Sequence, residues 1–408
     1  MTYKINKGLF IIVTIGIILR VLSIYLYADT DIDNEWGIMV NNLEKHGVLS
    51  VRSIDGTPVP NIFMPPLYPI LLYLIKIPIS DLNTFLNITF FVQLILATIS
   101  IILVHKICLE IFKENLSYFG TLIFSIFPLN VYAVSQISSI TLQMLLINIF
   151  LLSYINLLKN FRTKYSLIFA LSSSLLILLR GEFFIFVILS LIYLQIKQRK
   201  ILKIIVTSLI IVLIISPYLY RNYIIFNTIT VTKSAGYNLL KGNHPRTAVG
   251  GVGMFSNVEN VIHEVREKLL ELYDKGPIPK HDLLKDKILM DQAISFIKDD
   301  PKRYITLYFK KFVSFIFVNT NSNYPNYYSI SHIMPKIIIA LSTVLGILFV
   351  VSLKINIANY FILFYLANIG LFSFFFILPR YSLSLLTVQI ILSLYAIDTL
   401  IQKVKRKI

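Results

Sequence analysis

Long apolar runs recur along the 408-residue chain, and they restrict the folds that are open to it. Residues 9–26, 201–217 and 337–353 each contain no more than one charged side chain. At about 1.5 Å per residue, a helix of this length approaches the roughly 30 Å thickness of a bilayer's hydrocarbon core. Only 14% of all residues are charged, whereas about a quarter are charged in soluble domains. The sequence therefore predicts an all-α membrane protein.

The net charge of +17 invites a nucleic-acid partner, but its distribution argues against one. Lysine and arginine gather in short turns between apolar runs and near both ends, as in the cytoplasmic loops of membrane proteins. A nucleic-acid-binding surface would carry them along one folded face. We therefore expect membrane lipids as partners and no nucleic acid. The basic groups are Lys4 and Lys7; Lys106 and Lys113; Lys159, Arg162 and Lys164; Lys197, Arg199, Lys200 and Lys203; and Lys403, Lys405, Arg406 and Lys407.

Placing these basic turns inside predicts about ten spans in a multi-pass protein of the cell (inner or plasma) membrane, with both termini cytoplasmic. Residues 28–83 and 218–331 are then external loops. Within the first of these loops, residues 66–79 are too short to span and are predicted to be an interfacial helix. The predicted spans are residues 9–26, 84–104, 116–134, 137–158, 165–179, 183–196, 201–217, 337–353, 356–377 and 382–400.

The same pattern divides the chain into three regions. Residues 1–217 form a transmembrane bundle with the first external loop, residues 218–333 a small external loop domain, and residues 334–408 the last transmembrane helices. Residues 304–318 are expected to form an amphipathic helix on the membrane surface, because two adjacent lysines at their middle would be costly inside a bilayer. The single cysteine, Cys108, excludes an internal disulfide.

Acidic residues gather directly after the first apolar run. They stand at alternate positions before a tryptophan: Asp29, Asp31, Asp33 and Glu35. Two interpretations are open, a solvated acidic loop edge, or a general base or metal ligand at the boundary between water and lipid. A divalent metal is therefore a possible cofactor, and no other cofactor is indicated.

Arg180, Gly181 and Glu182 form a tight external turn between two predicted spans. An arginine in an external turn runs against the usual charge bias, which makes its presence informative. Two interpretations are open here as well. Arg180 could form an ion pair with Glu182, or its planar fork could bind a phosphate at the membrane surface.

The head of the second external loop is rich in glycine, asparagine and tyrosine, within residues 220–223, 236–239, 242–245 and 250–253. Flat rings and amide hydrogen bonds suit a sugar, and glycines permit close backbone approach. No Gly-Lys-Ser/Thr follows, so these glycines do not form a P-loop. A lone histidine here is more typical of a turn than of a metal site. The candidate substrate-binding residues are Arg221, Asn222, Tyr237, Asn238, Asn243 and His244.

At these positions the chain resembles bacterial membrane glycosyltransferases related to the protein O-mannosyltransferases and the lipid A aminoarabinose transferase. Two positions depart from that family's pattern, with Asn34-Glu35 in place of Asp-Glu and Arg180-Gly181 in place of Arg-Pro. The likeness rests on Asp33-Asn34-Glu35-Trp36-Gly37 with Asn42-Leu43, His46-Gly47 and residues 63–69; on Leu179-Arg180-Gly181-Glu182; on Tyr220-Arg221-Asn222-Tyr223 through Gly242-Asn243-His244-Pro245 to Gly250-Gly251; and on Pro379-Arg380-Tyr381.

The resemblance implies the C-type glycosyltransferase fold, with interfacial helices and a small external domain beside the spans. It implies mannosyltransferase-like transfer of a sugar from a polyprenyl-phosphate donor to a glycan, lipid or protein acceptor of the cell envelope, on the non-cytoplasmic face. A carboxylate among Asp33, Glu35 and Asp31 would be the general base. Arg380 and Tyr381 would join the candidate substrate-binding residues.

A transporter or flippase of lipid-linked sugars is the main alternative. Such a protein would place ionisable residues inside its spans, near the bilayer midplane. Most apolar runs lack such residues, and Arg20 in the first run is an exception. A non-catalytic scaffold is a third interpretation, which the clustered acidic residues make less attractive.

Overall fold

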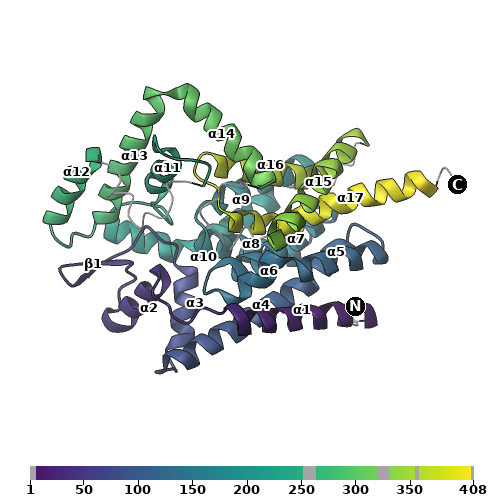
Figure 1. Cartoon of the computed structure of the whole chain (residues 1–408), viewed down its shortest axis with the longest axis horizontal. Coiled ribbons are helices and arrows are strands. Elements are labelled where there is room, and N and C mark those ends of the chain that lie inside the picture. Colours follow the sequence, from purple (N-terminus) through teal and green to yellow (C-terminus); the bar gives the residue numbers. More distant parts are fainter. Residues whose placement is uncertain (1–5, 251–262, 319–329, 354–357, 406–408) are drawn as a thin grey trace.

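The computed structural model describes residues 6–250, 263–318, 330–353 and 358–405, and these residues are almost entirely helical. Figure 1 shows one helical bundle with both ends of the chain on one side. The elements α2, β1, α11, α12 and α13 lie at the opposite side, which is the loop end of the molecule. The predicted all-α membrane fold is therefore confirmed.

The bundle is built from the apolar helices and the short elements that link them. It contains α1 (Lys7–Tyr27), α4 (Leu82–Leu109), α5 (Glu114–Ile126), α6 (Pro128–Tyr132), η1 (Ala133–Ser135), α7 (Ile140–Lys159), α8 (Thr163–Leu179), α9 (Phe183–Gln198), α10 (Ile201–Phe226), α15 (Ile330–Ser352), α16 (Ala358–Ser373), η4 (Pro379–Leu385) and α17 (Leu386–Lys405). The two long loops supply α2 (Glu35–His46), β1 (Arg52–Ile54), β2 (Thr57–Val59), α3 (Leu67–Lys76), α11 (Ala235–Asn243), α12 (His263–Asp274), α13 (His281–Asp299) and α14 (Pro301–Ile316).

Among the described residues, six helices are long and apolar enough to cross a membrane, and α5 with α6 and η1 can supply a seventh span. The helices α8, α9 and α16 are apolar but have only 17, 16 and 16 residues. Every predicted span therefore falls on an apolar helix, whereas the count of ten stays a prediction. One predicted end is wrong, because α10 continues through Pro217 to Phe226. Proline is tolerated inside spans where neighbouring helices satisfy the backbone.

The predicted span 116–134 is bent by 55° between α5 and Pro128–Ser135. A bend frees backbone carbonyls, which need new hydrogen-bond donors inside a bilayer. The Nδ2 of Asn130 donates to the carbonyl of Phe124 (2.7 Å), and the Nη1 of Arg20 donates to that of Ser125 (2.9 Å). Arg20 is fully buried and also donates to its own helix. The ionisable residue in the first span therefore supports the bend.

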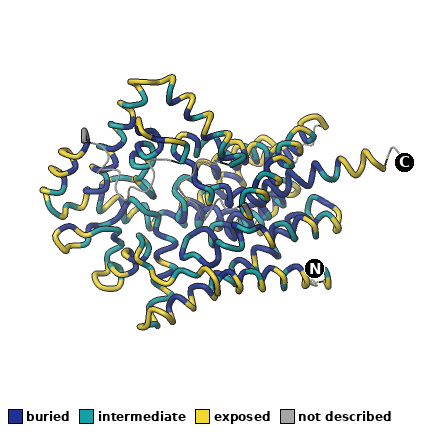
Figure 2. The backbone as a smooth tube through the Cα atoms, viewed as in Figure 1, coloured by how far each residue is buried: buried dark blue, intermediate teal, exposed yellow. Residues whose placement is uncertain are grey.

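The centre of the bundle is formed by α7 and by η4 with α17. In both spans 72% of the most apolar window is buried, against 28% in α1 and 22% in α10. Figure 2 shows the buried residues along the middle of the molecule and exposed residues on the outer helices. Because most exposed positions of α1 and α10 are apolar, these helices suit contact with lipid tails.

The loop end has a small core of its own, made by Leu240, Val265, Leu269, Leu289 and Ala293 from α11, α12 and α13. A separate two-stranded hairpin pairs β1 with β2 in the first loop. The hairpin's turn has positive φ at two successive residues, 50° at Asp55 and 75° at Gly56. An Asp-Gly pair is a preferred sequence for such a turn.

Close packing of α15 on α17 depends on Gly346. A Cβ at this position would lie 1.9 Å from the carbonyl oxygen of Leu392. We expect Gly346→Ala to push the helices apart and to lower the free energy of unfolding by about 1–3 kcal/mol, measured by thermal unfolding in detergent. Gly370→Ala in α16 is the control, because its Cβ would meet an atom of Tyr308 at an ordinary 3.6 Å. Equal effects of the two substitutions would contradict this account.

Candidate functional site

The helix α2 begins directly among the acidic residues of the first loop. Asn34 caps it, because its side-chain oxygen accepts the backbone N–H groups of Trp36 (3.0 Å) and Gly37 (3.3 Å). Glu35 lies in the first turn, where the partial positive charge of a helix N-terminus favours a carboxylate. The asparagine that departs from the family's Asp-Glu pattern therefore has a structural role here.

Asp29 fastens the first loop to the bend that follows α5. Its Oδ2 accepts the backbone N–H of Ile137 (2.7 Å), and its own N–H donates to the carbonyl of Ser135 (3.1 Å). Partial burial raises the pKa of Asp29, whereas the hydrogen bond from Ile137 lowers it. Next along the chain, Asp31 Oδ1 accepts the backbone N–H of Asp33 (3.3 Å). The carboxylate of Asp29 is thus used to hold the first loop in place, and one oxygen of Asp31 is used in a local hydrogen bond.

Asp33 and Glu35 present the least engaged carboxylates of this cluster. Both residues are exposed. Neither carboxylate has a hydrogen bond or ion pair with any residue that the structure describes. Beside them, the ring of Trp36 packs edge-on against Tyr68 of α3, with 5.1 Å between centroids. This contact fixes α2, so the two carboxylates are held on an ordered helix start.

Lys241 on α11 is a further candidate site residue, to which no sequence motif pointed. Its ammonium lies 4.8 Å from the ring centroid of Phe376 and 6.0 Å from that of Tyr237. Burial lowers the pKa of Lys241, the charge of Arg380 lowers it further, and the charge of Glu35 raises it. Lys241 therefore lies within electrostatic range of both Glu35 and Arg380. The only signal in the sequence was a lysine placed between the glycines of the second loop.

The turn between α8 and α9 meets η4 at Tyr381. The Tyr381 ring stacks on Phe372 with 5.1 Å between centroids and 25° between planes. Its hydroxyl lies in the electrostatic field of Arg380, Arg180 and Glu182. Arg380 is exposed, and Arg180 is partly buried. The structure thus brings together the predicted Arg-Gly-Glu turn and the predicted Arg-Tyr pair.

The ion pair between Arg180 and Glu182 does not form. The two ion pairs among the described residues lie elsewhere. The Arg180 Nε is buried without a hydrogen-bond partner in the described part of the chain. Between them, a Cβ on Gly181 would lie 2.4 Å from Thr232 Oγ1, so the close approach of the two segments requires glycine. The guanidinium of Arg180 therefore keeps donors that an anion can take.

The other predicted residues hold the second loop in shape, and we assign them to the scaffold. Tyr237 gives its backbone N–H to Asp286 Oδ1 (3.1 Å), and its ring packs edge-on against Phe63. The side-chain contacts of the rest are Arg221 Nη1 to Asn61 O (2.8 Å), Asn222 Nδ2 to Thr230 O (2.7 Å), Asn238 Nδ2 to Ser234 O (2.9 Å), Asn243 Nδ2 to Phe374 O (2.8 Å), and His244 Nδ1 from the Arg246 N–H (3.1 Å).

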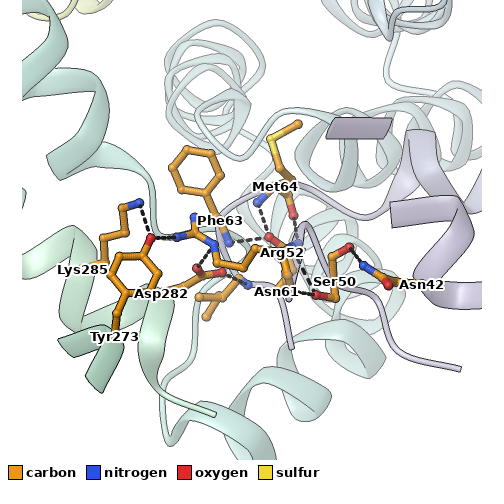
Figure 3. Close-up of polar contacts among 10 residues, drawn as sticks. Asn42, Ser50, Arg52, Asn61, Phe63, Met64, Tyr273, Asp282 and Lys285 are labelled. Atoms are coloured by element: carbon orange, nitrogen blue, oxygen red, sulfur yellow. Dashed lines mark hydrogen bonds and ion pairs between the residues drawn. The ribbon is translucent and has the colours of Figure 1, made fainter. Parts of the chain in front are cut away.

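A cluster of five residues joins the two loops and forms a clasp, most of which Figure 3 shows. Arg52 Nε lies 3.3 Å from Asp282 Oδ1, and Asp282 Oδ2 accepts the backbone N–H of Ile62 (3.3 Å). The Tyr273 hydroxyl accepts from Arg52 Nη1 (3.5 Å) and Lys285 Nζ (3.4 Å). Burial and the charge of Arg52 lower the pKa of Lys285 to about 7. These residues are far apart in the sequence, and no local pattern predicts that they meet.

The backbone beside the clasp is held from further directions. Asn61 Oδ1 accepts the N–H of Met64 (2.8 Å), which closes a turn ahead of the prolines of the first loop. The carbonyl of Asn61 accepts from Arg221 on α10 (2.8 Å), and that of Ile62 accepts the N–H of Lys233 (2.7 Å). Arg221 therefore serves to position the first loop.

Within the described ranges, no three His, Cys, Asp or Glu side chains are grouped to hold a metal ion. Asp31, Asp33 and Glu35 offer oxygen donors of the kind that divalent cations prefer. In the described structure these three carboxylates are not gathered around one point.

No protein-family model matches the chain, and no curated protein matches its sequence. Its fold is similar to that of the oligosaccharyltransferase AglB of the archaeon Archaeoglobus fulgidus. The complex of AglB with an inhibitory peptide and a dolichol-phosphate gives a TM-score of 0.57 at 15% identity, over 97% of this chain and 50% of that one. The complex with zinc and sulfate gives a TM-score of 0.57 at 15% identity, over 98% of this chain and 49% of that one. The form tethered to an acceptor peptide with the NVT sequon gives a TM-score of 0.56 at 15% identity, over 97% of this chain and 49% of that one.

This likeness concerns the fold. It confirms the predicted C-type glycosyltransferase fold of a polytopic membrane protein. The chain spans about half the length of these solved structures, with 49–50% of each covered.

The clasp can be tested by removing one partner. Asp282 is 2% exposed, so Asp282→Ala leaves Arg52 and the Ile62 N–H without their buried partner. We expect a loss of about 1.5–3 kcal/mol in the free energy of unfolding, the scale of a hydrogen bond to a charged group. Thermal unfolding in detergent measures it. Glu110→Ala is the control, because it breaks an exposed pair that contributes about 0–1 kcal/mol. Equal losses in the two variants would show that the buried contacts of Asp282 stabilise the protein no more than an exposed ion pair does.

Proposed function

We propose that the protein is a membrane glycosyltransferase that moves a sugar from a polyprenyl-phosphate-linked donor to an acceptor at the loop end. One observation carries the proposal. The exposed carboxylate of Glu35 and the guanidinium of Arg380 both act on Lys241, and Arg380 and Arg180 both act on Tyr381. The Nε of Arg180 has no hydrogen-bond partner among the described residues. A base and an anion-binding cluster are the parts that such a transfer needs. The fold of AglB, an oligosaccharyltransferase solved with dolichol-phosphate, supports the donor class.

The proposed reaction is a direct displacement at the anomeric carbon. Glu35, or Asp33 beside it, takes the proton of the acceptor's hydroxyl or amine as that atom attacks. The bond between the anomeric carbon and the phosphate oxygen breaks, and its electron pair leaves with the polyprenyl phosphate. Displacement in one step inverts the anomeric configuration, since no second carboxylate forms a covalent intermediate. Asp31 is the third candidate base.

The cations provide the second half of this chemistry. The departing phosphate gains negative charge as the bond breaks, and Arg180, Lys241 and Arg380 offset that charge. Arginine suits this task because its planar fork binds two phosphate oxygens at once. Tyr381 lies beside Arg380, whose guanidinium carbon is 5.9 Å from the centroid of the tyrosine ring. Glu182 acts on the same tyrosine and is a further candidate for substrate binding.

We place the loop end on the non-cytoplasmic face of the cell membrane, with both termini in the cytoplasm. Figure 1 shows both termini on the side away from the loops. The last turn of α17 carries Lys403 and Lys405, as the charge bias of cytoplasmic ends favours. The division into residues 1–217, 218–333 and 334–408 follows this arrangement. The acceptor is a glycan, a lipid or a protein of the cell envelope.

An assay in detergent separates a transferase from a flippase. The purified protein, given a polyprenyl-phosphate sugar and cell-envelope extract as acceptor, should consume the lipid-linked sugar without a sealed bilayer. Transfer breaks a covalent bond, whereas transport only moves an intact molecule across a membrane. Intact donor in detergent, together with its movement across sealed vesicles, would establish the transporter instead.

The carboxylate assignment predicts a large loss of turnover with little loss of stability. Glu35→Gln should lower turnover about 10²–10⁴-fold, the usual contribution of a general base. Because the side chain is exposed, the free energy of unfolding should fall by no more than about 1 kcal/mol, the contribution of a carboxylate at a helix N-terminus. Asp55→Asn is the control, since it removes an exposed carboxylate of the same loop at a left-handed position that asparagine tolerates. Wild-type turnover in Glu35→Gln, Asp33→Asn and Asp31→Asn alike would refute the assignment.

The phosphate assignment predicts a loss of donor affinity. Arg180→Ala should weaken donor binding by about 1.5–3 kcal/mol, and Arg180→Lys should restore it only in part, because an ammonium lacks the planar fork. Adding Glu182→Ala to Arg180→Ala should leave the free energy of unfolding the same as in Arg180→Ala alone, since no ion pair links the two residues. Titration of the donor, with Arg266→Ala on exposed α12 surface as control, measures this. Unchanged affinity in Arg180→Ala would leave Arg380 and Lys241 as the phosphate ligands.

A further inference from the structure

A pocket lies between α6, α14, α15 and η4, apart from the cluster around Glu35. Its walls are mostly apolar and include Leu129, Phe315 and Ile377. Lys336 from α15 and Ser382 from η4 also line it. No carboxylate is among the described residues that line this pocket. Any anion that pairs with its lysine must therefore come from outside the lining.

Lys336 is 8% exposed, and its Nζ is buried with no hydrogen-bond partner among the described residues. The other buried lysines that the structure describes, Lys285 and Lys311, do have partners. Lys311, for example, donates to the carbonyl of Gly242 (2.7 Å). A bare ammonium among apolar walls is costly in any folded protein, and more so in a membrane protein. Such a charge marks a binding site for a group of opposite charge.

The position of the pocket suits an amphiphilic ligand. The segment η4 forms part of its wall through Pro379 and Ser382, whereas Arg380 and Tyr381 between them belong to the other cluster. The pocket also borders α15, a candidate span, and α14, whose charged residues include an exposed lysine. It therefore combines one buried lysine with mostly apolar walls, in which His332 of α15 is the other basic residue.

We propose that this pocket binds the phosphate group of a lipid, with Lys336 as its counter-ion and the apolar walls around the adjoining chain. The site adjoins the cluster around Arg180 through η4, and its existence does not depend on the proposed transfer reaction. Two lipids carry this chemistry, a polyprenyl phosphate released or awaiting use at the neighbouring site, and an anionic phospholipid of the bilayer.

Lipid binding to the delipidated, full-length protein in neutral detergent tests this. Lys336→Met removes the charge and keeps an apolar side chain of similar length, so the variant should fold. Lys310→Met removes a charge from exposed α14 surface and is the control. The probes are farnesyl phosphate, farnesol, phosphatidylglycerol and inorganic phosphate. Native mass spectrometry counts the molecules bound, and thermal unfolding follows the stabilisation that a ligand confers.

Wild type and Lys310→Met should bind one more farnesyl phosphate than Lys336→Met, or bind it about 10- to 100-fold more tightly, as expected for a charge-assisted contact. The same difference with phosphatidylglycerol would assign a bilayer phospholipid, and its restriction to farnesyl phosphate would assign the polyprenyl carrier. Equal binding by Lys336→Met, or equal binding of farnesol or inorganic phosphate, overturns the proposal. Because binding is measured, a failed transfer assay leaves this result intact.

Discussion

The candidate site depends on a few polar contacts that hold two distant loops against each other. Asp282 and Arg221 both bind the backbone at residues 61–62, from positions 220 and 160 residues further along the chain. The first loop carries Glu35 on α2, and the second carries Lys241 on α11. Loops of this length would otherwise sample many relative positions, at an entropic cost that the contacts must offset. The clasp therefore converts two loops into one ordered platform.

The charges of the loop end fall into two groups that the sequence alone does not distinguish. Arg52, Arg221 and Lys311 donate to backbone or side-chain oxygens of the fold. Arg180 instead keeps a buried nitrogen without a partner, and Lys241 lies over aromatic rings. Cations exceed carboxylates in the second group, which gives the site a positive field. Such a field attracts phosphate and strengthens with exclusion of water.

Much of the fold could be predicted, because apolar runs and basic turns report directly on the membrane. The bend after α5 had only a Phe-Pro step as a signal, and the path of α10 through Pro217 depends on neighbours that a sequence does not show. For the site, the family motifs brought Glu35, Arg180 and Arg380 to attention. The asparagines of the second loop could not be sorted in the same way, because an amide that shapes a turn and an amide that binds sugar look alike. The pairing of Arg52 with Asp282 joins residues with no local pattern.

Arg20 has a consequence for how the protein is made. Its fully buried guanidinium donates to the carbonyl of Ser125, which is synthesised 105 residues later. At roughly 5–20 residues per second, the ribosome reaches that partner about 5–20 s after Arg20. Throughout this interval, a lone apolar helix with an arginine is poorly soluble in lipid, and its side chain must reach toward the headgroups or rest against the insertion machinery. We therefore expect the first helix to reach its final packing only after α5 has been made, so that the order of synthesis matters for folding.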